Sequence, residues 1–236
     1  MIDETDLSQE KRRFHEVRTS TLVKNLQKRN MDGQFAPSRH EALSAVMEMI
    51  PPGVTVARGD SMSVDQVGVF EELEKRNQNK LIDPLKKDEN GYHIYNSDER
   101  YQLEREVFFA DIFITGTNAI TLDGKLVNID GMGNRVSATV YGPRKVIVVV
   151  GANKLVANVD EALARIREFA APLNVIRHYQ KHHLPHLAEV PCFKTGICVD
   201  CSHAGRICRY TVIIEGSDTV HKGRINVVLV GEELGI

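Results

Sequence analysis

The chain has 236 residues, of which 42% are hydrophobic and 26% are charged, and its formal net charge is −2. A chain so close to neutral lacks the basic surface that nucleic acids or anionic membranes attract. The longest purely apolar run, residues 146–150, is much shorter than the roughly 20 residues of a membrane span, and the polar start resembles no signal peptide. These features predict one large domain in the cytoplasm, where thiols stay reduced.

The first segment predicts an amphipathic helix over residues 8–29. Apolar side chains recur at roughly helical spacing, at Phe14, Val17, Leu22 and Leu26. Such a stripe indicates either an arm that contacts a partner or a helix packed on its own domain. We divide the chain into an N-terminal helical arm, residues 1–31, and an α/β domain, residues 32–236.

A strand, a helix and a second strand are expected next, over residues 31–37, 39–50 and 54–57. Ser38 is a suitable helix N-cap, and Pro51-Pro52-Gly53 ends the helix. This order favours right-handed crossovers in a parallel sheet. A turn over residues 58–63 then leads into a helix over 64–75, for which Ser63 and Gln66 form a capping box.

The middle of the chain predicts a long surface loop within residues 78–98 and a helix over 99–109 that Asp98 caps. Residues 110–151 then form the unit around which the domain is organised. We expect strands over 111–115 and 146–150, a hairpin of residues 119–122 and 126–129 joined at Asp123-Gly124, and a helix over 132–141. The strands near 112–114 and 146–150 are apolar at every position, so they should be central neighbours covered on both faces.

The last third predicts a helix that starts at Asn158 or Asp160 and ends at Ala171-Pro172. Residues 173–209 lose regular periodicity and form a Cys/His-rich segment. Strands are expected again over 211–214 and 225–230.

The central sequence ITGTNAITLDGKLVNIDGMGNRVSATVYGPRKVIVVVG resembles the core motif of the lactate-utilisation (LUD) family. The likeness spans residues 22–235 and implies the fold of the sugar-phosphate isomerase and CoA-transferase-like group, an open and mainly parallel α/β sheet. A more distant similarity is to methylthioribose-1-phosphate isomerases and initiation factor 2B subunits. Those isomerases carry an aspartate for proton transfer where this chain has Asn118, which cannot titrate. The sequence therefore assigns no catalytic residue.

A binding site for a small anion is expected at the carboxyl ends of the strands. Glycine-containing turns at helix starts leave backbone N–H groups open to a ligand. Asp60 would repel an anion there, with Arg58 nearby to offset its charge. The alternative is that these residues serve turn and cap chemistry alone. The candidate residues are Gly59, Ser61, Ser63, Gly116, Asn118, Asn128, Asp130, Gly131, Gly133 and Asn134.

Four cysteines predict a metal site on the Cys/His-rich segment. Their spacing is Cys192-x5-Cys198-x2-Cys201-x6-Cys208, so short turns can bring the thiols together. Thiolates suit an iron–sulfur cluster, which the family resemblance also fits, or a tetrahedral zinc ion. Unliganded or redox-active thiols are the third possibility. The preceding histidines, His178, His182, His183 and His186, indicate either a metal or proton-transfer site or an exposed polar segment.

Two functions follow. The resemblance implies a protein of organic-acid (lactate) utilisation, a redox-associated metal-binding or Fe–S subunit that associates with other lactate-utilisation subunits or forms a homodimer. The alternative is a stand-alone transferase or isomerase-like enzyme that acts on a small phosphorylated or CoA-linked substrate, with a structural Zn. The sequence leaves open whether the chain is itself catalytic.

Overall fold

Parallel strands form the centre of the molecule. The computed structural model describes residues 4–236 and, within them, two β-sheets, of which the larger has six strands in the order β1-β10-β7-β4-β2-β3. All five pairings between these strands are parallel. The predicted α/β fold with a mainly parallel sheet is confirmed. The strands are β1 Asp32–Ala36, β2 Thr55–Arg58, β3 Lys80–Ile82, β4 Ile112–Thr115, β7 Lys145–Gly151 and β10 Ile225–Val230.

The two most apolar strands lie side by side in the middle of this sheet. Phe113 of β4 pairs with Val146 of β7, and Ile114 pairs with Ile147. All of β4 and nearly all of β7 are buried, and alternate side chains enter one of two cores, because successive strand residues point to opposite faces. The predicted central pair is confirmed.

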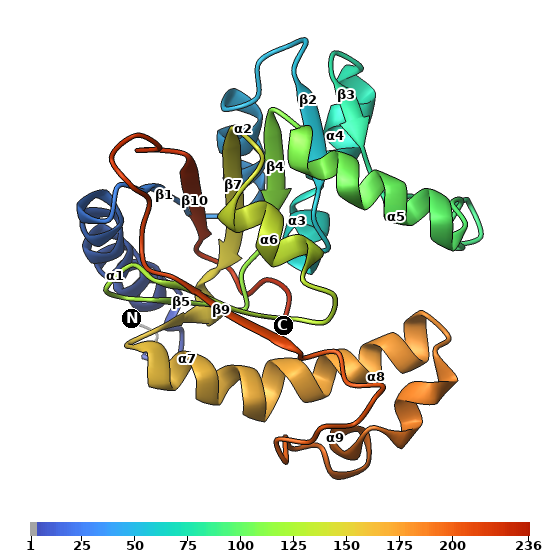
Figure 1. Cartoon of the computed structure of the whole chain (residues 1–236). Helices are drawn as coiled ribbons and strands as arrows, with labels where there is room; N and C mark the ends of the chain where they lie inside the picture. Colours follow the sequence, from blue (N-terminus) through green and yellow to red (C-terminus); the bar gives the residue numbers. More distant parts are fainter. Residues whose placement is uncertain (1–3) are drawn as a thin grey trace.

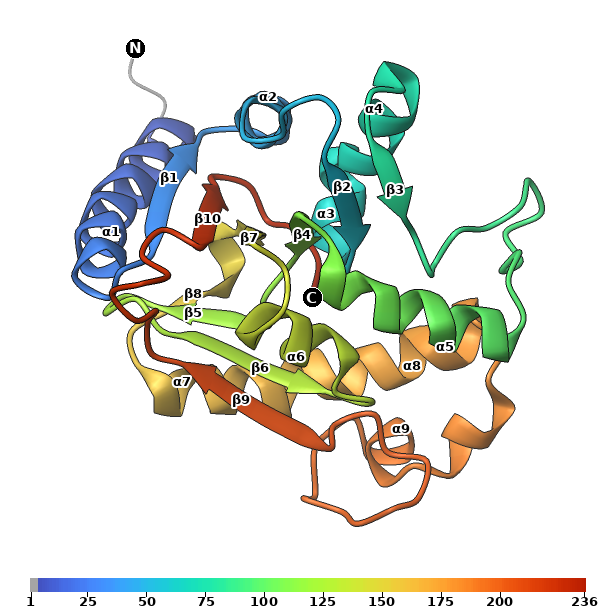
Figure 2. The same ribbon diagram turned by 45° about the horizontal axis from the view of Figure 1, so that its top comes forward.

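Helices cover both faces of the sheet (Figures 1 and 2). The core of one face takes side chains from α2 (Arg39–Glu48), α3 (Met62–Val67) and α4 (Val69–Arg76). The other core takes side chains from α1 (Ser8–Lys28), from α6 (Asn134–Val140) and from η1 (Val107–Phe109), which follows α5 (Ser97–Glu106). None of the helices within residues 4–236 combines the length and the apolar composition that crossing a bilayer requires.

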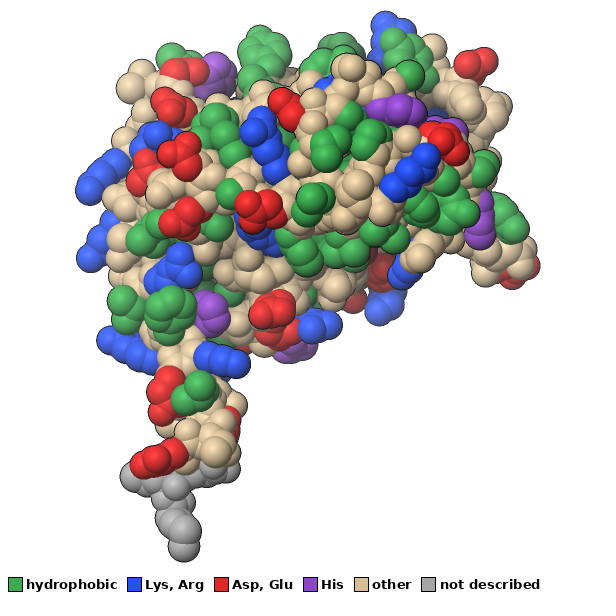
Figure 3. All heavy atoms as spheres, turned by 90° about the horizontal axis from the view of Figure 1, so that it is seen from below, with side chains coloured by type: hydrophobic (Ala, Val, Ile, Leu, Met, Phe, Trp, Pro, Cys, Tyr) green, Lys and Arg blue, Asp and Glu red, His purple; other side chains and the backbone are tan. Residues whose placement is uncertain are grey.

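The N-terminal helix α1 packs on the domain through its second half. Leu22 and Leu26 are buried in the core, whereas Phe14 and Val17 in the first half are exposed. Residues 1–3 of the predicted arm lie outside the described residues, and the division of the chain at residue 31 stays a prediction. From below, in Figure 3, acidic, basic and apolar side chains are interspersed over the surface.

The helix predicted over residues 64–75 is two helices. Gly68, with φ of 81°, ends α3 and starts α4, because glycine adopts this left-handed conformation without steric cost. The N-cap is Ser61, whose Oγ accepts a hydrogen bond from the Val64 amide, and not Ser63 as predicted. Ser63 is instead fully buried, and its hydroxyl donates to the carbonyl oxygen of Leu234 at 3.4 Å.

The loop between β3 and α5 ends in a capping box. Asn96 Oδ1 accepts hydrogen bonds from the amides of Asp98 and Glu99, and Glu99 Oε2 accepts one from the Asn96 amide. The helix therefore starts before the predicted cap Asp98, because the Asn96 side chain satisfies two of its free N–H groups.

A second sheet of four strands crosses the carboxyl-terminal edge of the first in the order β8-β5-β6-β9. Its strands β5 and β6 form the predicted hairpin, an antiparallel pair joined at Asp123-Gly124, where Gly124 has φ of 92°. Arg29 anchors this turn, since its Nη2 lies 2.9 Å from Asp123 Oδ2. The bounds are β5 Ala119–Thr121, β6 Leu126–Asp130, β8 Leu155–Val156 and β9 Tyr210–Ile214.

The helix predicted to end at Ala171-Pro172 continues past the proline. α7 (Val159–Arg165) runs through the π-helical turn η3 (Ile166–Ala170) into α8 (Ala171–Lys181). Pro172 lies in the first turn of α8, and the wide π turn before it accommodates a residue that has no N–H to donate. The Cys/His-rich segment is thus helical at its start, and it also contains η4 (Pro185–Glu189) and α9 (Pro191–Thr195).

Candidate functional site

The segments that follow β2, β4 and β7 meet at one edge of the main sheet, because parallel strands share the edge at which they end. They are residues 59–61, residues 116–118 and η2 (Ala152–Lys154). The first two pack closely. A Cβ atom added to Gly116 would clash with Ser61 Oγ, and one added to Gly59 would lie 2.7 Å from Thr115 Oγ1. Glycine is thus required at both positions.

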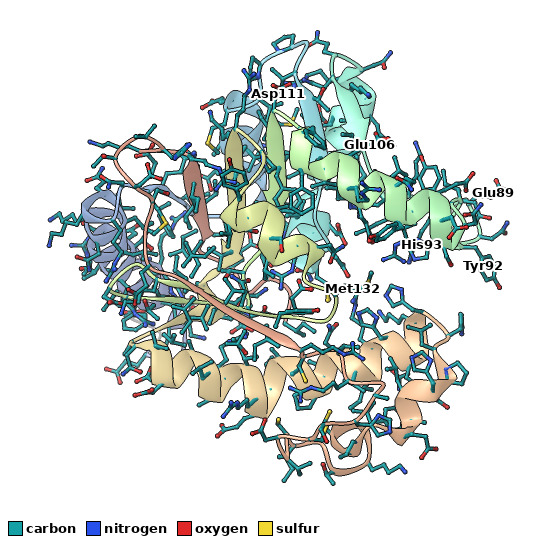
Figure 4. All side chains as sticks on the ribbon, viewed as in Figure 1. Glu89, Tyr92, His93, Glu106, Asp111 and Met132 are labelled. Atoms are coloured by element: carbon teal, nitrogen blue, oxygen red, sulfur yellow. The ribbon has the colours of Figure 1, made fainter. Side chains whose placement is uncertain are left out.

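A cavity of about 730 Å³ opens at this edge. Its wall comes from the strand ends, from the loop before α5, from the segment before α6 and from one face of α8. This volume is within the range of small-molecule sites. Figure 4 shows His93 and Met132, which line the cavity, on the side of the α/β body that faces α8. A smaller cavity of about 70 Å³ adjoins it and shares Arg58, Asp60 and Arg135.

Most of the predicted site residues come together here. Five of them line the main cavity: Ser61, Gly116, Asn118, Asp130 and Gly131. Gly59 and Asn134 line the smaller cavity, Ser63 and Asn128 are buried, and Gly133 packs beside Tyr210. The turn after β2 and the segment before α6 thus border one cavity. Ligand binding by these residues stays a prediction.

The guanidinium of Arg135 holds several of these groups together. Its Nε lies 3.1 Å from Asp130 Oδ2, and its Nη atoms donate to Asn128 Oδ1 at 2.8 Å and to Asn118 Oδ1 at 3.1 Å. The remaining N–H groups reach the carbonyl oxygens of Gly116 and Ile129, each at 3.2 Å. All five donors of this arginine are therefore used inside the protein, and its side chain is 13% exposed. Arg135 shapes the cavity wall rather than offering a free cation.

The amides expected to stay open before α6 are partly occupied. Asp130 Oδ1 accepts hydrogen bonds from the amides of Met132 at 3.1 Å and Gly133 at 2.8 Å. An aspartate at this position closes its own turn, as Asp and Asn side chains commonly do. A ligand in the cavity must therefore bind chiefly to side chains.

Lys154 is the most enclosed ionisable group of the cavity wall. It is 5% exposed, and its Nζ lies 3.1 Å from the hydroxyl oxygen of Ser63. Among residues 4–236, no carboxylate lies within ion-pair distance of this amine. Burial, followed by the charges of Arg165 and Arg135, lowers the pKa of Lys154 to about 7.

Basic side chains outnumber acidic ones around the cavity. Arg58 is paired with Asp65 at 2.7 Å and with Asp83 at 2.8 Å. Within the described part of the chain, Lys87, Lys154 and Arg177 have no carboxylate partner; Arg177 Nη1 donates to Asn174 Oδ1 at 3.3 Å. The basic residues that line the cavity are Arg58, Lys87, Arg100, Arg135, Lys154 and Arg177, and the acidic ones are Asp60, Asp65, Glu71 and Asp130.

One face of α8 lines the cavity, and Asn174, Arg177 and His178 have the spacing of such a face. The ring of His182 stacks on that of His178 at 4.7 Å between centroids and lies 6.3 Å from that of His93. Burial lowers the pKa of His178, and burial with the His178 and Arg177 charges lowers the pKa of His182 to about 4, so both are neutral near pH 7. His178 and His182 thus belong to the cavity, which the sequence indicated only through their four-residue spacing.

The opposite face of α8 packs on the cysteine segment. Val175 contacts a small core that contains Leu187, Val190 and Cys192. Burial raises the pKa of the Cys192 thiol, and the other three cysteines raise it further. The Arg206 guanidinium donates to the carbonyl oxygens of both Cys201 and Cys208. However, no group of three or more His, Cys, Asp or Glu side chains within residues 4–236 is arranged to hold a metal ion. The four free thiols are donors that suit a metal centre, and the metal site stays a prediction.

The basic residues of the wall, above all Arg135, Lys154 and Arg177, were not among the sequence candidates. A weak signal was present for Lys154, because it lies three residues after Gly151, the glycine that ends the most apolar strand. Nothing in the sequence around Arg177 distinguishes it from the exposed Arg167 on the same continuous helix.

The fold and the cavity together define an open α/β protein with a ligand-sized site at the carboxyl ends of its parallel strands. Residues 20–230 match the LUD domain, and the chain belongs to this family. The family membership predicted from the central motif is confirmed.

Solved structures with similar folds have low sequence identity to this chain. A DUF162 family protein from Deinococcus radiodurans is similar over 93% of this chain and 97% of its own, with 14% identity and a TM-score of 0.49. The match to the translation initiation factor eIF-2B of Pyrococcus horikoshii OT3 includes 52% of this chain and 49% of that protein, with 20% identity and a TM-score of 0.36. The match to ribose 5-phosphate isomerase from Plasmodium falciparum includes 51% of this chain and 52% of that protein, with 16% identity and a TM-score of 0.31. No curated protein shows a significant match.

Proposed function

We propose that this chain is a cytoplasmic LUD-family protein of organic-acid utilisation whose main cavity binds a small 2-hydroxy or 2-oxo carboxylate, such as lactate or pyruvate. The observation that carries the proposal is the excess of basic side chains in the cavity wall. Within residues 4–236, Arg177 on α8 and Lys87 in the loop before α5 are cations without a carboxylate partner. Family membership supports the organic-acid class.

A ligand carboxylate would supply the partner that these cations lack. Removing a charged group from water costs several kcal/mol unless a counter-charge or hydrogen bonds compensate it. Hydrogen bonds between a charged donor and a carboxylate are worth about 1.5–3 kcal/mol each. The hydroxyl group of Ser61, which lines the cavity, is available for the second oxygen function of such an acid.

Exchange of Arg177 for glutamine is expected to weaken pyruvate binding by about tenfold or more, because it removes one charged contact. Isothermal calorimetry of the full chain measures this effect. The matched control is Arg167→Gln, which changes an exposed arginine on the same continuous helix and should leave the affinity unchanged. Equal affinities for all three proteins would show that the cavity is not the binding site.

The size of the cavity favours the alternative function, a transferase or isomerase-like enzyme for a phosphorylated or CoA-linked substrate. A volume of about 730 Å³ exceeds what a three-carbon acid fills. The same calorimetry with ribose 5-phosphate and with CoA separates the two functions. Tight binding of either ligand, with no heat from pyruvate or lactate, would replace the organic-acid proposal.

The predicted metal centre remains part of this proposal without a step assigned to it. Four thiols are the donors that an iron–sulfur cluster or zinc requires. Protein purified without oxygen is expected to contain iron or zinc, and the double substitution Cys198→Ser and Cys201→Ser is expected to remove it while the main sheet stays folded. Metal analysis and circular dichroism test this. Metal-free protein with four titratable thiols would contradict it.

The expected partners, other lactate-utilisation subunits or a second copy of the chain, stay predictions.

A further inference from the structure

The environment of Lys154 differs from that of a structural lysine. A buried lysine normally pairs with a carboxylate, because an uncompensated buried charge is costly. Here Nζ donates a hydrogen bond to the Ser63 hydroxyl at 3.1 Å, and the charged groups that act on the amine are the guanidinium groups of Arg165 and Arg135. Both repel a proton on Nζ.

The position of this amine is fixed from several sides. Lys154 is the last residue of η2, which directly follows the central strand β7. The C-terminal segment lies close to the amine, because a Cβ atom added to Gly235 would be 2.8 Å from Nζ and 2.9 Å from Ser63 Oγ. The C-terminal segment thus covers one side of the amine, and the cavity lies on another. Lysines that are desolvated or placed next to other cations are those that act as nucleophiles towards carbonyl groups.

A simple anion-binding role explains these observations less well. An arginine or a solvated lysine would hold an anion better, since both stay charged at neutral pH. An amine with a pKa of about 7 is instead in substantial part a free base near neutrality. The free base carries the lone pair that attack on a carbonyl carbon requires.

We propose that Lys154 Nζ forms an imine with the carbonyl carbon of a 2-oxo acid bound in the main cavity. This inference rests on the proposed function, because it assumes that the cavity binds such an acid. The amine lone pair forms the C–N bond as the carbonyl π electrons pass to oxygen, and one nitrogen proton moves to that oxygen to give a carbinolamine. Loss of the hydroxyl group together with the remaining nitrogen proton then yields the C=N bond and one water molecule, with no net change of oxidation state. The Ser63 hydroxyl, 3.1 Å from Nζ, can take up or return a nitrogen proton.

Reductive trapping tests the proposal. The full chain is incubated with pyruvate and sodium cyanoborohydride, which reduces an imine to a stable secondary amine. The expected product is one adduct per chain, with a mass gain equal to pyruvic acid less one oxygen atom, and peptide mapping should place it on Lys154. Lactate has a hydroxyl group in place of the ketone and should give no adduct.

Two variants make the assignment specific. Lys154→Met should lose the adduct, whereas Lys125→Met, which removes a lysine paired with Asp123 and Glu215 outside the cavity, should retain it. Calorimetry on the same wild-type sample reports pyruvate binding independently. Binding without an adduct, or an adduct spread over surface lysines and unchanged in Lys154→Met, would overturn the imine but leave the proposed function standing. The absence of both binding and adduct would overturn both.

Discussion

Replacement of Arg135 by methionine is expected to lower the free energy of unfolding by about 3–5 kcal/mol, the cost of removing one partner from a buried ion pair. Asp130, which is 8% exposed, would lose its charged partner. The side-chain oxygens of Asn118 and Asn128 would each lose the guanidinium donor and keep one backbone amide donor. Because these groups line or support the cavity, pyruvate binding should be lost as well. Urea unfolding followed by circular dichroism measures the stability.

The control for this experiment is Arg144→Met. The Arg144 side chain is 88% exposed and lies 3.9 Å from Asp111, so its loss should change the stability by no more than about 0.5 kcal/mol. Adding Asp130→Asn to Arg135→Met should recover part of the loss, because the unpaired buried charge is then removed. A loss below about 1 kcal/mol for Arg135→Met alone would show that the guanidinium does not organise this site.

Lys154→Met is expected to behave in the opposite way, with a stability at pH 7 at least equal to that of the wild type. The pKa of Lys154 is about 7 in the folded chain, against an ordinary value of 10.5. Between these values the unfolded chain binds more protons than the folded chain, so wild-type stability rises with pH. Below pH 7 both states are protonated and the full cost of burying the charge is present.

The expected signature is a pH-dependent difference between the two proteins. From pH 7 to pH 10, the free energy of unfolding of the wild type minus that of Lys154→Met should increase by roughly 1.4 kcal/mol per pH unit. Taking this difference cancels the titration of the other groups. Urea unfolding at several pH values in this window measures it. A difference that does not change with pH would mean that the amine keeps its charge in the folded chain.

The consequences of these two substitutions were not visible in the sequence, although much of the architecture was. Residues 112–114 and 146–150 are apolar at every position, and such runs need cover on both faces, which places them at the centre of a sheet. Asp123-Gly124 between two β-rich pieces specifies a tight hairpin by local turn chemistry alone. Gly59 and Gly131 were expected to border one binding site, because parallel strands end at the same edge of a sheet.

Predictions of helix ends and helix caps from neighbouring residues in the sequence failed where contacts in the folded structure changed them. Pro172 was taken as a helix end, but the π turn before it lets the helix pass and brings Arg177 and His178 to the cavity. The capping rule selected Ser63, yet packing against Leu234 and Lys154 buries that hydroxyl and leaves Ser61 as the cap. In both cases the deciding contacts come from residues far away in the chain.

The sequence by itself determined the fold class, the central strands and the edge of the sheet at which a site would form, because hydrophobic periodicity and turn chemistry act over a few neighbouring residues. The tertiary structure alone decided which charges meet there. Arg135 is satisfied by groups from β6 and from the loop between β4 and β5. Lys154 contacts Ser63 and the segment around Gly235 and, within residues 4–236, no carboxylate. The charge state of a buried group depends on its distance from every other charge and from water, and those distances exist only once the chain has folded.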